Sequence, residues 1–513
     1  MAKECRNFDN RLLKCLKSFP SVSYYSSAKT KDYLMKINRK PFPEKGTDGF
    51  SLISEMKTIK TRDAAWRKGK MFGYIYYPGD KTAHVVEEAY QMFTSENALN
   101  PSLFISLKKF ESEAVQMLAD LLHAGPEAAG SFTTGGTESI LLAVKTARDK
   151  ARADHPEIKL PEILVPESAH PAFDKAAHYL DVKIIHTPVR DDKRADINAL
   201  RQAITKNTIL LVGSAPSFPH GVIDPITDIG ILALEHGLPF HVDACMGGMV
   251  LPFAEKLGYP IPLFDFRVPG VTSISADIHK YGYSPKGASV VIYINREFRR
   301  HQFFAFTDWS GGLYGSPTMM GTRCGGPIAG AWAALRYNGL EGYMSMTREV
   351  MEASKKLQEG INAIPGLQVV SNPDMSVFAF TSEKYNIFQI GDRLSAKGWT
   401  LDRIQFPGSL HMTVSYHNVK LVNEFLTAVS ESLTLVSEAK GKSRTINLVV
   451  SFVKRMSKLL PDNWFRRLSA LLMTEKQDDE RHEMGAAMYG ITEKIENRKN
   501  VHELVLDVMD RMY

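Results

Sequence analysis

The sequence predicts an α/β fold, in which a large domain with a mostly parallel sheet is followed by a smaller α+β C-terminal domain. Three observations support this prediction. Between about residues 100 and 335, short apolar segments alternate with amphipathic helical segments, as in strands joined by helical crossovers. Residues 208–212 form an unbroken apolar run, which is typical of a strand buried on both faces. After Gly339 the pattern changes to long helical stretches and short strands.

The elements of the large domain follow one another along the chain. Apolar residues at helical spacing predict helices, and short apolar runs between turn residues predict strands. Asp196 precedes its helix as an N-cap. In order, we expect a helix at 110–122, a turn at 131–139 opening a helix with the apolar face Ile140, Leu141, Val144 and Ala147, a strand at 162–166, a helix at 172–180, a strand at 182–185, a helix at 197–204, a strand at 208–212, a helix at 229–236, and strands at 240–242 and 271–275.

The smaller domain is expected to contain a helix at 343–362 and strands at 369–371, 377–380 and 410–416. Residues 1–70 are polar and rich in turn-forming residues, so they predict an N-terminal arm. The resulting division is an arm at 1–70, a large domain at 71–340 and a small domain at 341–513, with a basic insert at about 440–480.

The composition is that of an ordinary globular chain. Of 513 residues, 44% are hydrophobic and 23% charged, which excludes disorder or a coiled coil as a description of the whole. The four cysteines form no C-x-x-C pair and are too few for a disulfide framework. We therefore expect a reducing compartment, no zinc ribbon and no metal site.

The net charge of +6 belongs to one segment. Residues 440–474 hold eight lysines and arginines against one aspartate, so the remainder of the chain is close to neutral. The basic balance therefore gives no reason to expect nucleic acid binding. No apolar run fits a signal peptide or a transmembrane helix, so we expect a soluble, cytoplasmic chain with peripheral membrane contact at most.

Chemistry-bearing residues follow several predicted strands, where ligands bind in open α/β sheets. Gly135-Gly136-Thr137 precedes a helix; it is either a phosphate cradle or a turn with a capping threonine. Asp243 follows the strand at 240–242. It could keep a heterocyclic nitrogen protonated, or serve as a helix cap or buried salt-bridge partner.

Lys280 follows the strand at 271–275, and His170 follows the strand at 162–166. In a cleft, Lys280 would lose solvation, which lowers its pKa and frees the amine for a Schiff base; otherwise it is a surface lysine. His170 could stack on a cofactor ring or be an ordinary loop histidine. Together, the phosphate turn, the stacking ring, the acid and the lysine fit one cofactor, pyridoxal 5′-phosphate (PLP).

Longer sequence blocks extend this interpretation. The chain resembles the sphingosine-1-phosphate lyase family, among the fold-type I PLP-dependent enzymes that also include the group II amino acid decarboxylases. The resemblance runs from about residue 60 to 435 and resumes near 484. It is carried by TTGGTESILLAVKTARD (133–149), FPHGVIDPI (218–226), HVDACMGG (241–248), FDFRVPGVTSISADIHKYGYSPKG (264–287), TDWSGGLYGSPTMMGTR (307–323), AKGWTLDRIQFP (396–407) and MGAAMYG (484–490).

The resemblance implies roles for residues around the cofactor. Lys280 matches the Schiff-base lysine, Asp243 the partner of the pyridinium nitrogen and His170 the stacking histidine. Residues matching contacts to the cofactor phosphate are Gly136, Thr137, His279 and Thr322, the last at a position where the family usually has a serine reaching from the second subunit. We therefore expect a homodimer with its active site at the subunit interface.

The resemblance also implies residues around the substrate. Tyr76 and Lys286 match groups that hold the substrate phosphate, and Tyr314 and Tyr489 match tyrosines near the reacting carbon. Asn100 stands where the family commonly has a histidine that contacts the substrate phosphate. Asparagine donates a hydrogen bond there but carries no charge.

The implied activity is a retro-aldol cleavage of the C2–C3 bond of sphingosine 1-phosphate and related phosphorylated sphingoid bases. Its products are a long-chain aldehyde and phosphoethanolamine. The base for the C3 hydroxyl is left open among Lys280, a tyrosine and an oxygen of the cofactor phosphate. The alternatives are a related PLP-dependent amino acid decarboxylase and a catalytically idle scaffold that binds membranes.

Asn100 is one departure from the family pattern. The basic insert at about 440–480 is another, because the family generally lacks it. Residues 446–473 show two apolar stripes at helical spacing, flanked by basic residues and separated near Pro461. Basic amphipathic helices lie on anionic membranes, and this insert would supply the peripheral contact through 440–474. The alternative is a helical hairpin packed on the small domain, which is the commoner use of amphipathic helices.

Overall fold

The computed structural model describes residues 41–438, 501–503, 505–506 and 509–510. The chain divides into two units, Met1–Ala65 and Trp66–Tyr513. In the first unit, the helix α3 (Gly49–Lys60) begins where the Asp48 side chain accepts a hydrogen bond from the backbone amide of Ser51 at 3.0 Å. The second unit contains the sheets described below.

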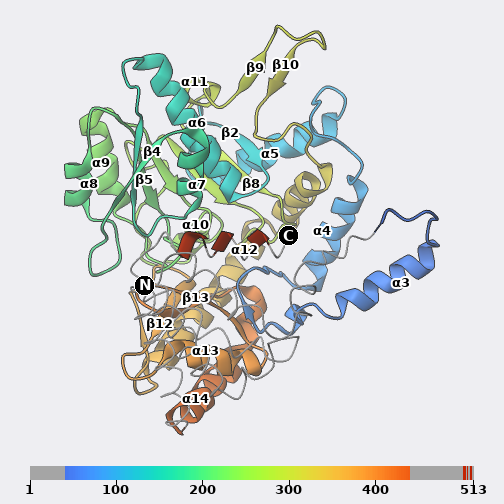
Figure 1. The fold of residues 1–513 in the computed structure, drawn as a ribbon, viewed down its shortest axis with the longest axis vertical. Coiled ribbons are helices and arrows are strands. Elements are labelled where there is room, and N and C mark those ends of the chain that lie inside the picture. The colour runs from blue at the N-terminus through green and yellow to red at the C-terminus, as the bar shows by residue number, and fades with distance from the viewer. Residues whose placement is uncertain (1–40, 439–500, 504, 507–508, 511–513) are drawn as a thin grey trace, which may run out of the picture. The chain divides into compact units, whose positions relative to one another are not determined.

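A seven-stranded sheet forms the centre of the second unit, with helices on both of its faces (Figure 1). Its strand order is β2-β8-β7-β6-β5-β3-β4, and β8 alone runs antiparallel to its neighbours. The mostly parallel sheet predicted from the sequence is thus confirmed. The strands are β2 (Ala129–Thr133), β3 (Glu162–Pro166), β4 (Lys183–Thr187), β5 (Thr208–Ser214), β6 (Phe240–Asp243), β7 (Ser273–Asp277) and β8 (Ser289–Tyr293).

Two hydrophobic cores explain why the central strands are apolar throughout. Successive side chains of a strand point to opposite faces, and in β5 Leu210 and Val212 join one core while Leu211 joins the other. The helices described in this half are α4 (Asp80–Met92), α5 (Ile105–Leu121), α6 (Gly136–Asp154), α7 (Ala172–Leu180), α8 (Ile197–Ala203), α9 (Ile226–His236), α10 (Leu251–Lys256) and α11 (Arg296–Arg300). As predicted, Asp196 caps α8.

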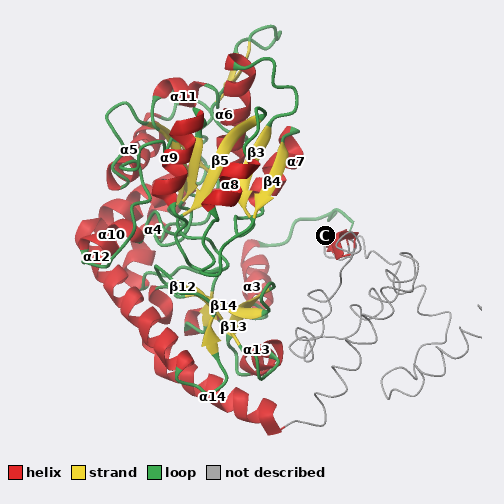
Figure 2. Cartoon of the chain, turned by 90° about the vertical axis from the view of Figure 1, so that its left-hand side faces the viewer, coloured by secondary structure: helices red, strands yellow, loops and turns green. Residues whose placement is uncertain are grey.

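A second sheet of five strands has the order β1-β13-β14-β12-β11 and its own core around Trp399, Phe378 and Phe425. Its strands are β1 (Met71–Phe72), β11 (Gln368–Val369), β12 (Val377–Thr381), β13 (Thr400–Ile404) and β14 (Ser409–Thr413), and it packs with α13 (Ile387–Ala396) and α14 (Val422–Glu438). Figure 2 shows α12 (Gly325–Asn362) running alongside both sheets. Neither this helix nor any other in the described ranges is long and apolar enough to cross a membrane.

Two differences from the sequence prediction concern the second sheet. The strand expected at 410–416 ends at Thr413, because Ser415 starts a capping box with Asn418 that turns the chain into a 3-10 helix, Tyr416–Leu421. The short strand β1 was not predicted; it lies near the start of the expected large domain but pairs in parallel with β13 of the second sheet. The domain boundaries proposed from the sequence stay a prediction.

Gly221 provides a test of how the β5–α9 connection packs on the second sheet. Its φ is +68°, and a Cβ atom there would collide with the backbone carbonyl of Val377 at the start of β12. Gly237, at the end of α9, has a similar φ of +63°, but a Cβ there would meet nothing within 4 Å. In urea denaturation, we expect Gly237→Ala to lower the unfolding free energy by about 1 kcal/mol and Gly221→Ala by roughly 3 kcal/mol or more. Equal losses would contradict this account of the packing.

Candidate active site

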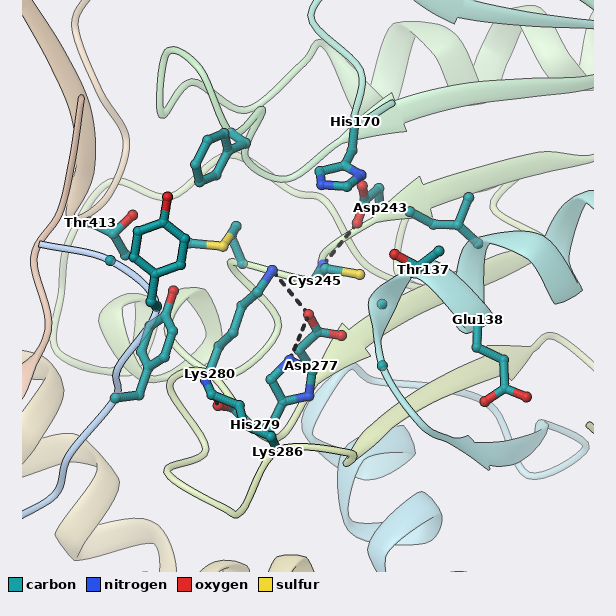
Figure 3. Close-up of a pocket in the computed structure, with 18 of the residues that line it drawn as sticks. Thr137, Glu138, His170, Asp243, Cys245, Asp277, His279, Lys280, Lys286 and Thr413 are labelled. Carbon is teal, nitrogen blue, oxygen red and sulfur yellow. Dashed lines mark hydrogen bonds and ion pairs between the residues drawn. The ribbon is translucent and has the colours of Figure 1, made fainter. Parts of the chain in front are cut away.

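A cavity of about 550 Å³ lies at the carboxyl edge of the seven-stranded sheet, where it faces the second sheet (Figure 3). The last residues of β5, β6 and β7, namely Ser214, Asp243 and Asp277, line it. Thr413, the last residue of β14, lines it from the other side. Of the predicted site residues, the structure brings eight together around this cavity: Tyr76, Gly136, Thr137, His170, Asp243, His279, Lys280 and Lys286.

The turn between β2 and α6 forms one wall. Gly136 begins the 19-residue helix α6, whose first backbone N–H groups have no partner within the helix and favour an anion. A Cβ on Gly136 would stand 2.8 Å from the Cys245 sulfur and 3.0 Å from both carboxylate oxygens of Asp277, so only glycine fits this close approach. Glu138 steadies the turn, because its carboxylate accepts hydrogen bonds from the backbone and hydroxyl of Thr134 at 2.6 and 2.7 Å.

Asp243 is buried at the end of β6. Its Oδ1 accepts hydrogen bonds from the backbone amide of Cys245 at 3.0 Å and from the hydroxyl of Ser275 at 3.3 Å. Within the described residues, Oδ2 has no hydrogen-bond donor, which leaves it free to accept one from a ligand in the cavity. His170 lies next to Asp243 in Figure 3.

The His170 ring is neutral and fixed in orientation. Its Nδ1 accepts a hydrogen bond from the backbone amide of Ala172 at 3.1 Å, which places the ring proton on Nε2. Burial lowers the pKa of His170, although the nearby charge of Asp243 opposes this effect. A neutral, immobile imidazole is suited to lie against a flat aromatic ligand.

Lys280 points its amine into the cavity, where its Nζ lies 3.0 Å from a carboxylate oxygen of Asp277 (Figure 3). Burial by itself lowers the pKa of Lys280, but the negative charge of Asp277 outweighs it and raises the pKa above its ordinary value. The lowered pKa predicted from the sequence is therefore wrong for this structure. The difference arises because Asp277, a buried carboxylate, lies three residues before Lys280. The sequence prediction considered only the loss of solvation of the lysine.

Lys286 and Tyr76 lie together at one side of the cavity. The Lys286 amine lies 4.8 Å from the centre of the Tyr76 ring and donates a hydrogen bond to the backbone carbonyl of His279 at 3.2 Å. Lys286 retains solvent access, yet protein atoms surround its amine; this partial burial, followed by the charge of Lys280, lowers its pKa to about 8. Burial raises the pKa of Tyr76, so its phenol stays protonated.

Three predicted residues do not line this cavity. Asn100 instead accepts hydrogen bonds from the backbone amides of Ser102 and Leu103. Thr322 accepts one from the Asn97 side chain at 3.4 Å. Tyr314 lies on the hairpin of β9 (Phe304–Phe306) and β10 (Tyr314–Ser316). Tyr489, the block at 484–490 and the basic insert at 440–480 lie outside the described residues.

The structure adds cavity residues that the sequence interpretation did not single out. Asp277 is the most important, and it was missed because the strand β7 extends two residues beyond its predicted end at Ser275. Tyr74 and Asp402 also line the cavity and share a hydrogen bond, although 328 positions separate them in sequence. Only the pairing of β1 with β13 brings these two close, so no local pattern could have revealed them.

The lining fits PLP. The amide groups at the start of α6 would hold its phosphate, with Thr137 and His279 beside them. Lys280 would meet its aldehyde, His170 its ring face and the open Oδ2 of Asp243 its ring nitrogen. No group of three His, Cys, Asp or Glu side chains in the described ranges is arranged to hold a metal ion.

Comparisons with known proteins agree with a PLP-binding site in this chain. The family model described as the pyridoxal-dependent decarboxylase conserved domain matches residues 33–383. A sphingosine-1-phosphate lyase from Oryza sativa subsp. japonica is 46% identical over 447 residues, covering 84% of this chain and 82% of that protein. Sphingosine-1-phosphate lyase 1 from Rattus norvegicus is 41% identical over 452 residues, covering 85% and 79%.

Solved structures give the same result. The sphingosine-1-phosphate lyase of Burkholderia pseudomallei K96243 has a TM-score of 0.76 and 38% identity, covering 85% of this chain and 99% of that one. A glutamate decarboxylase from Lactobacillus brevis, at 17% identity, shares the fold with a TM-score of 0.69 and coverages of 80% and 98%. The chain therefore has the PLP fold-type I architecture, and it belongs to the sphingosine-1-phosphate lyase family of PLP-dependent enzymes.

Proposed function

We propose that this enzyme cleaves the C2–C3 bond of sphingosine 1-phosphate and related phosphorylated sphingoid bases by retro-aldol chemistry, giving a long-chain aldehyde and phosphoethanolamine. The observation that carries the proposal is that Lys280, Asp243 and a second cation, Lys286, share one cavity. The first two suit the cofactor, and the third suits a phosphorylated substrate. The sphingosine-1-phosphate lyases among its relatives support this choice.

When bound, PLP supplies an electron sink for the pair of electrons released by the broken bond. The chain's own groups make that sink effective. The Asp243 carboxylate is held by Cys245 and Ser275 and stabilises a proton on the ring nitrogen. Lys280 would provide the amine that holds the cofactor. The base for the C3 hydroxyl stays open among Lys280, a tyrosine and an oxygen of the cofactor phosphate.

Substrate recognition depends on Lys286 and Tyr76. Below pH 8, Lys286 is mostly protonated and offers a positive charge to the substrate phosphate. The protonated phenol of Tyr76, next to it, donates a hydrogen bond. Asn100 lies outside this chain's own cavity, so a contact between it and the substrate phosphate would require a second subunit.

Product analysis tests the proposal directly. We expect the PLP-loaded enzyme to release a long-chain aldehyde and phosphoethanolamine from a sphingoid-base phosphate. The matched control is Asp243→Asn, which keeps the cavity shape but removes the charge, and its turnover should fall by about 10²–10³-fold. Release of carbon dioxide from an amino acid, without aldehyde from the sphingoid-base phosphate, would instead identify a decarboxylase. An enzyme with neither activity would favour the scaffold.

The pH dependence of substrate binding tests Lys286. Because this lysine loses its proton as pH rises through about 8, KM for the phosphorylated substrate should increase above that pH. Lys286→Arg should keep KM low to higher pH, since guanidinium stays charged. Lys286→Gln should raise KM by about tenfold or more below pH 8 and flatten its rise. An unchanged KM profile in both variants would remove Lys286 from phosphate recognition.

We also propose that the enzyme works as a homodimer whose subunits complete each other's sites. The hairpin β9–β10 and the loop within it expose large apolar side chains, including Phe304, Trp309 and Leu313, the last 86% exposed. Apolar patches of this kind support association with another subunit. Tyr314 and Thr322 lie on or just after this hairpin and away from their own cavity. Peripheral membrane contact through 440–474 stays a proposal that the described residues do not address.

Mixing inactive variants tests the shared site. One variant carries Lys280→Ala, and the other carries both Thr322→Ala and Tyr314→Phe. Each variant should be weak or inactive alone. Random mixing makes half of the dimers mixed, each with one intact site, so co-expression should restore about one quarter of the wild-type activity. No recovery, in a sample shown to contain mixed dimers, would place Tyr314 and Thr322 outside the partner's site.

A further inference from the structure

Asp277 makes the closest charged contact with Lys280. It ends β7, its side chain is 2% exposed, and one of its carboxylate oxygens lies 3.0 Å from the Lys280 amine. Asp243, the other strand-end carboxylate in the cavity, makes no ion pair with Lys280 within 4.0 Å in the described chain. The lysine thus faces two acids and pairs with only one of them.

The Asp277 carboxylate is held rigidly from behind. Its Oδ1 accepts a hydrogen bond from the Ser289 hydroxyl at 2.5 Å, and Ser289 is within hydrogen-bond distance of Ser139 at 3.0 Å. Ser139 in turn contacts Thr133 at 2.6 Å, which continues a buried chain of hydroxyl groups from β8 to α6 and β2. A carboxylate fixed in this way holds the lysine amine at a fixed place in the cavity.

We propose that Asp277 is a positioning residue that holds the Lys280 amine in its charged form before the cofactor binds. This inference rests on the proposed role of Lys280 as the cofactor-binding lysine. An ammonium group has no lone pair to attack a carbonyl carbon, so Lys280 must release a proton before it can react. Cofactor uptake therefore requires the ion pair with Asp277 to open and the ammonium group to transfer one proton to water.

The other groups around the amine do not replace Asp277. Apart from Asp277 and the phenols, the titratable side chains that line the cavity are Glu138, His170, Asp243, Cys245, His279, Lys286 and Asp402. Glu138 accepts hydrogen bonds from Thr134 and Met319, and Asp402 accepts one from Tyr74; in the described chain neither makes an ion pair with Lys280 within 4.0 Å. Burial raises the pKa of the Cys245 thiol well above its ordinary value and lowers the pKa of both histidines, so these three stay neutral near pH 7. The phenols of Tyr76 and Tyr281 have raised pKa values because they are buried, and Lys286 adds a repulsive positive charge.

Without its partner, Lys280 should lose its proton more easily. In Asp277→Asn, burial and the charge of Lys286 would act on the amine with no nearby ion pair to oppose them, so the pKa of Lys280 should fall. A decrease of one unit in the pKa of Lys280 gives about ten times more neutral amine at neutral pH. PLP uptake by the apoenzyme should then become at least about tenfold faster at pH 7.

Trace acetylation of the apoenzyme with acetic anhydride over a pH series, followed by peptide mass analysis, measures the titration of each lysine without any need for activity. In the wild type, the labelling midpoint of Lys280 should lie above that of the exposed Lys108 in the same sample. In Asp277→Asn it should fall by at least about one pH unit, whereas Asp243→Asn, the matched control, should change it much less.

The outcomes are distinct. A wild-type midpoint for Lys280 at or below that of Lys108 overturns the proposal, even if the Asp277 variant fails to fold. An unchanged midpoint in a folded Asp277→Asn variant does the same. PLP uptake, followed by absorbance, should accelerate in that variant together with the fall in the midpoint. If the predicted midpoints are found but no aldehyde is produced from the sphingoid-base phosphate, the proposed substrate is wrong while the role of Asp277 stands.

Discussion

The register of three parallel strands determines the position of the acid in this site. Ser214 of β5 pairs with Asp243 of β6, and Asp243 pairs with Ser275 of β7. Because side chains alternate between the faces of a sheet, a slip of one residue would turn Asp243 away from the cavity. The buried apolar residues of β5 on both faces make such a slip costly, so the hydrophobic core also fixes the geometry of the chemistry.

Charge balance is the second constraint. The cavity contains the carboxylates of Asp243 and Asp277 and the amines of Lys280 and Lys286 within a few residues of strand ends. Buried charges persist when they are paired or hydrogen-bonded. Asp277 pairs with Lys280, and backbone and hydroxyl donors satisfy Asp243. Lys286 contacts a backbone carbonyl and an aromatic ring, and within the described ranges it makes no ion pair within 4.0 Å. An anionic ligand is the natural partner for that lysine.

Much of this arrangement could be predicted from the sequence because it depends on local pattern. Asp243 and His170 follow recognisable strands, and the glycine pair before α6 is visible as a turn. The environment of Lys280 could not be predicted, because it depends on where β7 ends, and two further strand residues place Asp277 beside the amine. The pairing of β1 with β13, which brings Tyr74 to Asp402, joins segments too distant for any periodicity to connect.

The central claim is that Lys280, and no other lysine, forms the covalent bond with the cofactor. Reduction of the PLP-loaded enzyme with borohydride makes that bond permanent, and peptide mass mapping then identifies the modified residue. We predict a single modified lysine at position 280. Modification of Lys286, or of a lysine outside the cavity, with Lys280 left free, would contradict this account.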